Sequence, residues 1–185
     1  MKFYRLIAAT QSYIWGGKRL FALGKKTNDG IIAESWELSF RPEGKTLVET
    51  PNGLKTLEEI VSKEELGTNC EKYPFFPLLI KFIDAANDLS LQVHPSDEYA
   101  LKNENSFGKT EMWYVMDADK DAQLHIGFNE DYPKEEVDER IRNGSILEIM
   151  NHIPIKKGDC YFIPSGTLHA IGKGAMICEI QENSN

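Results

Sequence analysis

The sequence predicts an all-β fold with short helical excursions, arranged as a sandwich or barrel. Many short apolar or alternating runs lie between turns that contain glycine or proline, which is typical of antiparallel sheets. Helical patterns are few and short, and they do not alternate regularly with strands, which disfavours a doubly wound parallel sheet. A length of 185 residues is enough for a sizeable core, so we expect a single domain over residues 1–185.

The strand predictions rest on hydrophobic period. Ala33–Phe40 alternates between apolar and polar side chains, which predicts a half-buried strand. Leu78–Ile83 is apolar at all but one position, which predicts a buried strand. In chain order, strands are expected over Ala33–Phe40, Lys45–Glu49, Leu78–Ile83, Leu89–Val93, Met112–Met116, Ala122–Phe128, Cys160–Ile163 and Ala175–Ile180, with a further strand beginning at His169.

The helix predictions rest on end signals. Pro133–Asn143 is the clearest helix, because proline opens it, acidic residues come early, arginines come late and Gly144 follows. Thr56–Lys63 begins with a capping box, in which Thr56 is followed three residues later by Glu59. Shorter helical segments are expected over Asp97–Asn103 and Ser145–Met150.

Composition excludes several classes of protein. Hydrophobic residues make up 41% and charged residues 27% of the chain, which is ordinary for a globular protein and argues against disorder. Lys and Arg number 21 and Asp and Glu 29, so the net charge is −8, and no basic tract indicates nucleic acid or an anionic membrane as a partner. No apolar run approaches the ~20 residues of a membrane span. An anionic small molecule remains compatible, because a few well-placed lysines can dominate locally.

The three cysteines indicate a reducing compartment. Cys70, Cys160 and Cys178 are odd in number, far apart and without CxxC spacing, so we expect buried free thiols. The N-terminus carries no convincing secretory signal. We therefore expect a cytoplasmic protein.

The run Leu89–Pro95 is the first with chemical interest. Strand period places Ser90, Gln92 and His94 on one face and three apolar residues on the other. A hydroxyl, an amide and an imidazole that face a barrel interior need partners, and a metal ion is one such partner. The alternative is a polar strand edge that faces solvent.

The second run is Gly108–Val115. Lys109, Glu111 and Trp113 share a face, so a carboxylate ligand lies beside a cation suited to an anionic substrate. The alternative is a surface Lys–Glu pair, which is common in proteins.

The third run, Gly158–His169, has the spacing G-x5-P-x-G-x2-H. It matches the second cupin motif, in which the histidine is a metal ligand inside the barrel, so we expect a cupin-like jelly-roll barrel. The alternative is a core histidine bonded to a backbone carbonyl. Gln92, His94, Glu111 and His169 together supply two imidazoles and two oxygens, which suits one Zn²⁺ per chain. Mn²⁺, Fe²⁺ or Co²⁺ would also fit this set.

Several runs together resemble a known family. LSLQVHPSDEYA, GKTEMWYV and IPSGTLHAIGKG are similar to runs of the type I mannose-6-phosphate isomerases of the short bacterial class, as are YIWGG and AESWELSF. The resemblance extends from about Tyr13 to Glu182. It implies zinc bound by Gln92, His94, Glu111 and His169.

The resemblance also implies roles for other residues. Those matching Ser90 and Lys109 lie at the phosphosugar site, Trp15 matches an aromatic residue near the pocket mouth, and Glu179 matches a carboxylate at the reacting end. The implied reaction interconverts mannose 6-phosphate and fructose 6-phosphate through a cis-enediol, with a phosphorylated hexose as substrate. Lys109 and Glu179 are then the catalytic candidates. Glu179 is the expected base, with His94 or a bound water molecule as alternatives.

In the family the chain continues beyond the position of Asn185, through a stretch with an essential arginine and into a second β-domain. The sequence, which lacks that arginine, is therefore expected to represent the N-terminal, catalytic part of such a chain. The alternative is a protein that works differently. The alternative function is a non-catalytic cupin module that binds a metal or phosphosugar. A cupin oxygenase is disfavoured by Gln92 and the adjacent Lys109. His125 and His152 lie outside the matching runs, and we expect both to be structural or on the surface.

Overall fold

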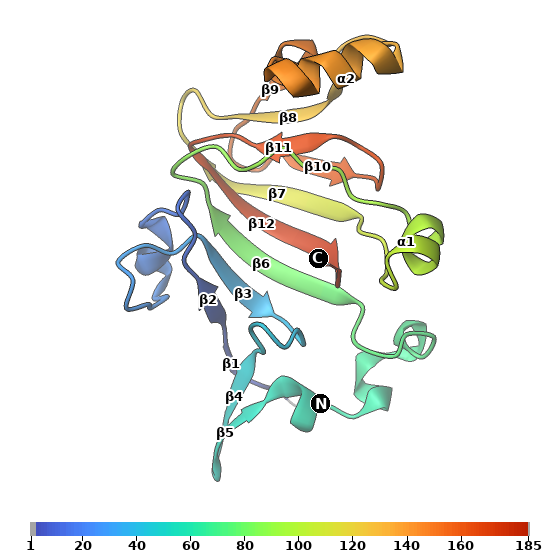
Figure 1. The fold of residues 1–185 in the computed structure, drawn as a ribbon. Coiled ribbons are helices and arrows are strands. Elements are labelled where there is room, and N and C mark those ends of the chain that lie inside the picture. The colour runs from blue at the N-terminus through green and yellow to red at the C-terminus, as the bar shows by residue number, and fades with distance from the viewer. Residues whose placement is uncertain (1–2, 185) are drawn as a thin grey trace.

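The computed structural model describes residues 3–184, which form three antiparallel sheets (Figure 1). The large sheet contains, in spatial order, β10 (Cys160–Ile163), β7 (Glu111–Ala118), β12 (Ala175–Glu182), β6 (Leu78–Asp84), β3 (Glu34–Leu38) and β2 (Ala9–Gln11). The small sheet contains β11 (His169–Ile171), β8 (Gln123–Phe128) and β9 (Met150–Pro154). A peripheral sheet contains β1 (Leu6–Ile7), β4 (Leu47–Thr50) and β5 (Gly53–Thr56).

The hydrophobic core lies between the large and small sheets. Ile83, Trp113 and Ile177 project from the large sheet and pack in one cluster with Leu124 and Ile171 of the small sheet. Each of these five side chains is at most 3% exposed. Burying a large apolar side chain contributes about 1.5–3 kcal/mol, so this shared cluster holds the two sheets face to face. The predicted all-β class is confirmed.

The helices are short and lie between strands. The α-helices are α1 (Asp97–Asn103) and α2 (Lys134–Asn143), and the 3₁₀ turns are η1 (Arg19–Leu23), η2 (Leu57–Glu59), η3 (Lys63–Leu66), η4 (Thr68–Cys70) and η5 (Ile146–Ile149). Two of the four predicted helical segments, Asp97–Asn103 and Pro133–Asn143, are thus confirmed. Helix α2 ends at Gly144, whose φ of 78° is the left-handed conformation that glycine favours. Within residues 3–184, neither helix is long and apolar enough to cross a membrane.

Three local predictions are wrong. Leu89–Val93 is not a strand, although it runs beside β11: Leu89 N–H bonds to Ile171 O and Gln92 N–H to His169 O. Three steps along this segment therefore match two steps along β11, and the extra residue breaks the ladder as a β-bulge does. The predicted helix over Thr56–Lys63 contracts to the turn η2, which keeps its capping box.

The third wrong prediction is the helix over Ser145–Met150. Gly144 turns the chain out of α2, so only the turn η5 forms before Met150 begins β9, a strand that the sequence pattern did not reveal. The cysteines are free, as expected, but none is buried. Cys160 is exposed because it begins the edge strand β10 on the outer side of the sheet, with its Sγ 3.4 Å from Met112 Sδ.

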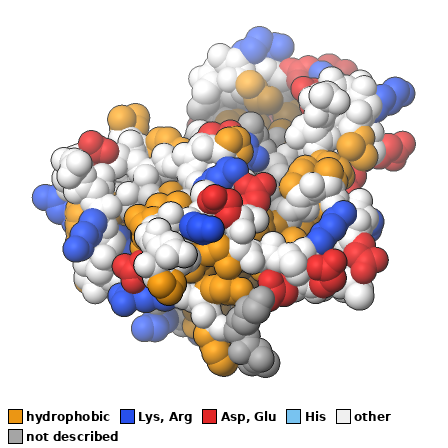
Figure 2. Space-filling view, turned by 90° about the horizontal axis from the view of Figure 1, so that it is seen from below, with side chains coloured by type: hydrophobic (Ala, Val, Ile, Leu, Met, Phe, Trp, Pro, Cys, Tyr) orange, Lys and Arg blue, Asp and Glu red, His pale blue; other side chains and the backbone are white. Residues whose placement is uncertain are grey.

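Charged side chains of both signs lie close together on the face seen from below (Figure 2). Acidic and basic side chains are interspersed with hydrophobic ones there, including in the middle of the face. The lysines that bear on the site described next are instead buried: Lys81 is 9% and Lys109 is 7% exposed.

His125 and His152 lie side by side on β8 and β9, with ring centroids 4.6 Å apart in an edge-to-face contact. Burial, and next the neighbouring His152, lower the pKa of His125 below its usual value of 6.5. The unfolded chain therefore binds a proton at His125 more readily than the folded chain, so folded stability is lost as the pH falls below 6.5.

We expect His125→Phe to weaken this acid sensitivity, because a phenyl ring keeps the edge contact and does not titrate. The measurement is the urea midpoint of each protein at about pH 7 and at about pH 5. The midpoint of the variant should fall less than that of the unaltered chain. An equal fall in both proteins would show that His125 does not contribute.

Candidate metal centre

A cavity of about 290 Å³ opens between the two sheets at the end of the core. Its volume is close to the lower limit of typical small-molecule sites. It is polar in character, because three carboxylates and two ammonium groups contribute to its lining. The lining residues are Tyr13, Trp15, Glu34, Lys81, Ile83, Leu89, Ser90, Gln92, Lys109, Glu111, Trp113, His169, Ala170, Ile171 and Glu179.

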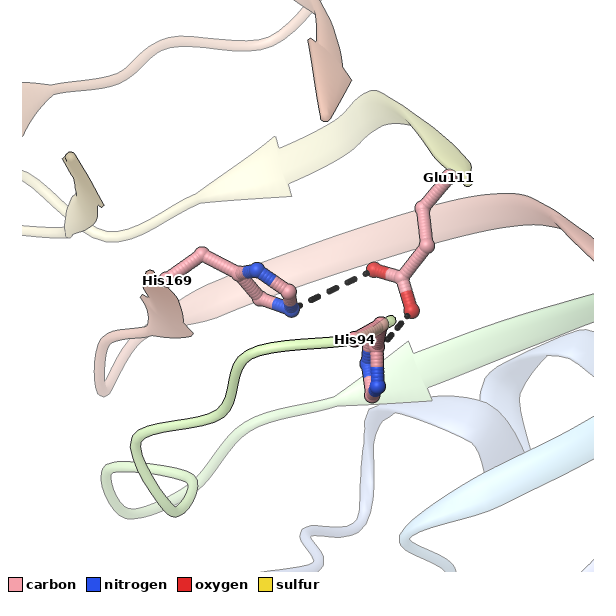
Figure 3. Close-up of side chains that lie close together, drawn as sticks. All are labelled: His94, Glu111 and His169. Carbon is pink, nitrogen blue, oxygen red and sulfur yellow. Dashed lines mark ion pairs between the residues drawn. The ribbon is translucent and has the colours of Figure 1, made fainter. Parts of the chain in front are cut away.

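His94, Glu111 and His169 come together beside this cavity (Figure 3). Glu111 is the first residue of β7, His169 the first of β11, and His94 lies in the loop before α1. One ligand atom from each lies within 4.8 Å of the other two. His94 Nε2 is 3.2 Å from Glu111 Oε1, and His169 Nε2 is 3.7 Å from Glu111 Oε2. Three of the four residues predicted to bind a metal thus lie close together, although they come from distant parts of the sequence.

The histidines have the features of metal ligands. His169 Nδ1 is 2.8 Å from the carbonyl oxygen of Thr167, a contact that places the proton on Nδ1 and leaves the Nε2 lone pair facing the cluster. His94 Nε2 is buried and makes no hydrogen bond, although it faces the Glu111 carboxylate. A divalent cation between these atoms would satisfy all three residues, so the donor set fits a metal ion.

The electrostatics keep these ligands ready to bind. Burial raises the pKa of the Glu111 carboxyl, but the neighbouring imidazole of His94 and the ammonium group of Lys109 outweigh it and lower the pKa to about 2. Burial lowers the pKa of His169. At neutral pH the carboxylate is therefore ionised and the His169 imidazole neutral, which are the forms that bind metals.

Gln92 and Ser90 lie at the same cavity, on the segment beside β11. Gln92 exchanges two backbone hydrogen bonds with His169, of 2.9 and 2.8 Å, so the two residues are fixed next to each other. The Gln92 side-chain Nε2 donates to Ser90 Oγ at 3.0 Å, which leaves the amide oxygen as the atom available to a cation. Both residues are exposed and accessible from the cavity.

Lys109 and Glu111 are not a surface pair. Lys109 Nζ is 3.0 Å from Glu111 Oε1, and the two residues are 7% and 3% exposed. The ammonium group neutralises the carboxylate inside the protein, where an unpaired charge would be costly. The alternative of a solvated pair on a strand surface is therefore excluded.

A second buried ion cluster also lines the cavity. Lys81 Nζ is 3.1 Å from Glu179 Oε1 and 3.3 Å from Glu34 Oε1. Burial opposes the charge on Lys81, but Glu179 and then Glu34 outweigh it and raise the pKa of this lysine. Glu179 is 3% exposed, and burial raises the pKa of its carboxyl. The structure thus places Glu179 at the cavity, in an ion pair with the ammonium group of Lys81.

Sequence analysis missed Lys81 and Glu34. A signal for Lys81 was present, because it is the one charged residue of the otherwise apolar run Leu78–Ile83. Trp15 does reach the cavity, and its ring lies 5.6 Å from that of Tyr13, which also contributes to the lining. All the predicted site residues therefore meet around one cavity or directly beside it.

Comparison with known proteins agrees with this picture. Residues 3–137 match the family model described as the catalytic domain of type I phosphomannose isomerase. A mannose-6-phosphate isomerase from Streptococcus mutans is 41% identical over 176 residues, which cover 93% of this chain and 55% of that protein. The chain thus spans about half the length of this curated relative.

Solved structures show the same fold. The crystal structure of the mannose 6-phosphate isomerase from Bacillus subtilis matches with a TM-score of 0.86 and 36% identity, over 99% of this chain and 58% of that one. A mannose 6-phosphate isomerase solved with zinc bound matches with a TM-score of 0.75 and 18% identity, over 98% of this chain and 68% of that one. The predicted cupin-like jelly-roll fold is confirmed.

Proposed function

The chain belongs to the type I phosphomannose isomerase family, and from this membership we propose that it is a metal-dependent isomerase that interconverts mannose 6-phosphate and fructose 6-phosphate. The observation that carries the proposal is the cavity itself. It brings a metal-ligand set within reach of a buried carboxyl and two buried ammonium groups. Aldose–ketose isomerisation needs a cation for the developing oxyanion and a base for the proton. The cytoplasmic location of the protein and the single domain over residues 1–185 stay predictions.

We propose Zn²⁺ as the cofactor, held by His94, Glu111, His169 and the amide oxygen of Gln92. When bound, the ion supplies positive charge to the substrate oxygens at C1 and C2. The relative solved with zinc bound supports this choice of metal. Among the lining residues the carboxylates outnumber the ammonium groups by one, so a divalent ion reverses the local charge and allows an anionic sugar phosphate to bind.

Glu179 is the residue that we propose to move the proton between C1 and C2. The raised pKa of the Glu179 carboxyl is nearer to neutral pH than the pKa of a solvated glutamate. This suits a group that both takes and returns a proton. Lys81 holds it at 3.1 Å and limits that rise, so the carboxylate form stays accessible. His94 is less suited to this role, because its Nε2 faces the ligand cluster.

Lys109 and Ser90 are the residues that we propose to bind the phosphate or the sugar hydroxyls. Lys109 Nζ contacts Glu111 and has further N–H donors for a substrate oxygen. Ser90 Oγ accepts from Gln92, so its own hydroxyl hydrogen is free to donate. Trp15 contributes an apolar wall to the same cavity.

The experiment is an isomerase assay on the zinc-loaded chain with mannose 6-phosphate, compared with Glu179→Gln. We expect turnover by the unaltered chain and a loss of about 100-fold or more in the variant, because general acid–base catalysis contributes about 10²–10⁴-fold. The zinc content of the variant should be unchanged. Binding of the sugar phosphate without turnover by the zinc-loaded chain would refute the isomerase proposal and favour a binding module.

A further inference from the structure

The indole of Trp113 contacts three functional groups of the site at once. Its Nε1–H lies 3.0 Å from Glu111 Oε2 and 3.1 Å from Glu179 Oε2, so one donor is shared by two carboxylates. Its ring packs edge-on against His169, with centroids 5.4 Å apart and planes at 77°. The residue is 1% exposed. These contacts join the metal-ligand set to the carboxyl of Glu179.

We propose that Trp113 is a positioning residue, which holds the ligand carboxylate of Glu111 and the proton-transferring carboxylate of Glu179 at a fixed separation through its single N–H. This inference rests on the proposed function, because it assigns Glu111 to the metal and Glu179 to the substrate. An indole N–H donates and does not accept, so Trp113 cannot move the proton itself.

The strand register explains why this one residue reaches both carboxylates. Trp113 lies directly opposite Glu179 in the β7–β12 pair. Glu111 precedes Trp113 by two positions on β7 and therefore projects from the same face. The arrangement follows from the sheet, so it is fixed before any ligand binds.

The shared N–H also has an electrostatic consequence. Two buried carboxylates near each other repel strongly, since charges interact more strongly away from water. A donor between Glu111 and Glu179 offsets that repulsion and gives each carboxylate one anchored oxygen. Anchoring prevents Glu179 from turning towards the metal ligands, where it would become an extra ligand and stop serving as a base. Partners behind a ligand typically change metal affinity or activity by about 10–100-fold when they are removed.

The chain contains a matched control. Trp36 is 7% exposed, and its Nε1–H donates at 2.7 Å to Glu34 Oε2, a carboxylate outside the ligand set. Trp36→Phe removes an indole hydrogen bond to a buried carboxylate, just as Trp113→Phe does. The two variants differ in whether the carboxylate belongs to the metal site.

The test measures zinc affinity by competition with a chelator, together with kcat and KM for mannose 6-phosphate. For Trp113→Phe we expect zinc affinity to fall by about 10–100-fold and kcat at saturating zinc to fall while KM changes little. Trp36→Phe should keep the zinc affinity of the unaltered chain. Unchanged zinc affinity together with unchanged kcat in Trp113→Phe would overturn the proposal, and so would an equal loss of zinc affinity in Trp36→Phe.

If Trp113→Phe does not fold, 3-benzothienylalanine at position 113 replaces the N–H with sulfur at nearly the same shape, and the same outcomes apply. The measurements also separate this inference from the proposed function. An unaltered chain that binds zinc without turnover refutes the isomerase. In that case, the loss of zinc affinity on removing the N–H still reports whether Trp113 positions Glu111.

Discussion

Replacing His169 with alanine is expected to abolish stoichiometric zinc binding. The Nε2 atom of His169 faces Glu111 and belongs to the ligand cluster, while Nδ1 is held by the carbonyl of Thr167. Alanine removes one of the four proposed ligands. The remaining set is one donor short of the four that zinc favours, so zinc should be lost on dialysis.

The matched control is His152→Ala. His152 is an exposed histidine on β9 that contacts His125, away from the cavity. Elemental analysis after dialysis should give about one zinc ion per chain for the unaltered protein and for His152→Ala. Zinc at the same stoichiometry in a folded His169→Ala protein would show that the ligand assignment is wrong.

Lys81→Met is expected to produce the largest loss of stability. It leaves the buried carboxylates of Glu34 and Glu179 without the ammonium group that lies 3.3 and 3.1 Å from them. Removing one partner of a buried ion pair costs about 3–5 kcal/mol, because the remaining charge is uncompensated. The variant should accordingly unfold at a much lower urea concentration at neutral pH.

The pH dependence identifies the cause. With Lys81 gone, the folded protein should bind a proton at Glu179 more tightly than the unfolded chain does, because Lys81 is the charge that limits the rise of the Glu179 pKa. The stability of Lys81→Met should therefore rise as the pH falls from neutrality towards the carboxyl range. Adding Glu179→Gln to Lys81→Met should recover part of the loss at neutral pH. Normal stability of Lys81→Met would contradict the role of Lys81. So would a double variant that is no more stable at neutral pH than Lys81→Met alone.

Sequence patterns predicted the parts of the site that short runs encode. His94 follows Gln92 by two residues, Glu111 opens a strand with alternating faces, and His169 closes a long motif with fixed glycines and proline. Each run is local, so its face and its chemistry can be derived without knowledge of the tertiary structure. The structure brings His94, Glu111 and His169 together, and their binding of zinc stays a proposal.

The contacts that sequence patterns missed depend on pairing between distant strands. Trp36, Lys81, Glu179 and Trp113 form one row across β3, β6, β12 and β7, because each lies opposite the next in the register. No local period reveals which strands become neighbours. The Lys81–Glu179 ion pair and the shared indole donor both arise from that row. The false strand at Leu89–Val93 has a similar cause, since its extra residue is visible only against β11.

The most direct test of the metal centre is a crystal structure of the zinc-loaded chain, with anomalous diffraction measured on both sides of the zinc absorption edge. We predict one anomalous peak beside the cavity, within about 2.0–2.2 Å of a nitrogen of His94 and of His169 and of an oxygen of Glu111 and of Gln92. A fully occupied zinc ion elsewhere in the protein, with no peak among these four residues, would contradict the account.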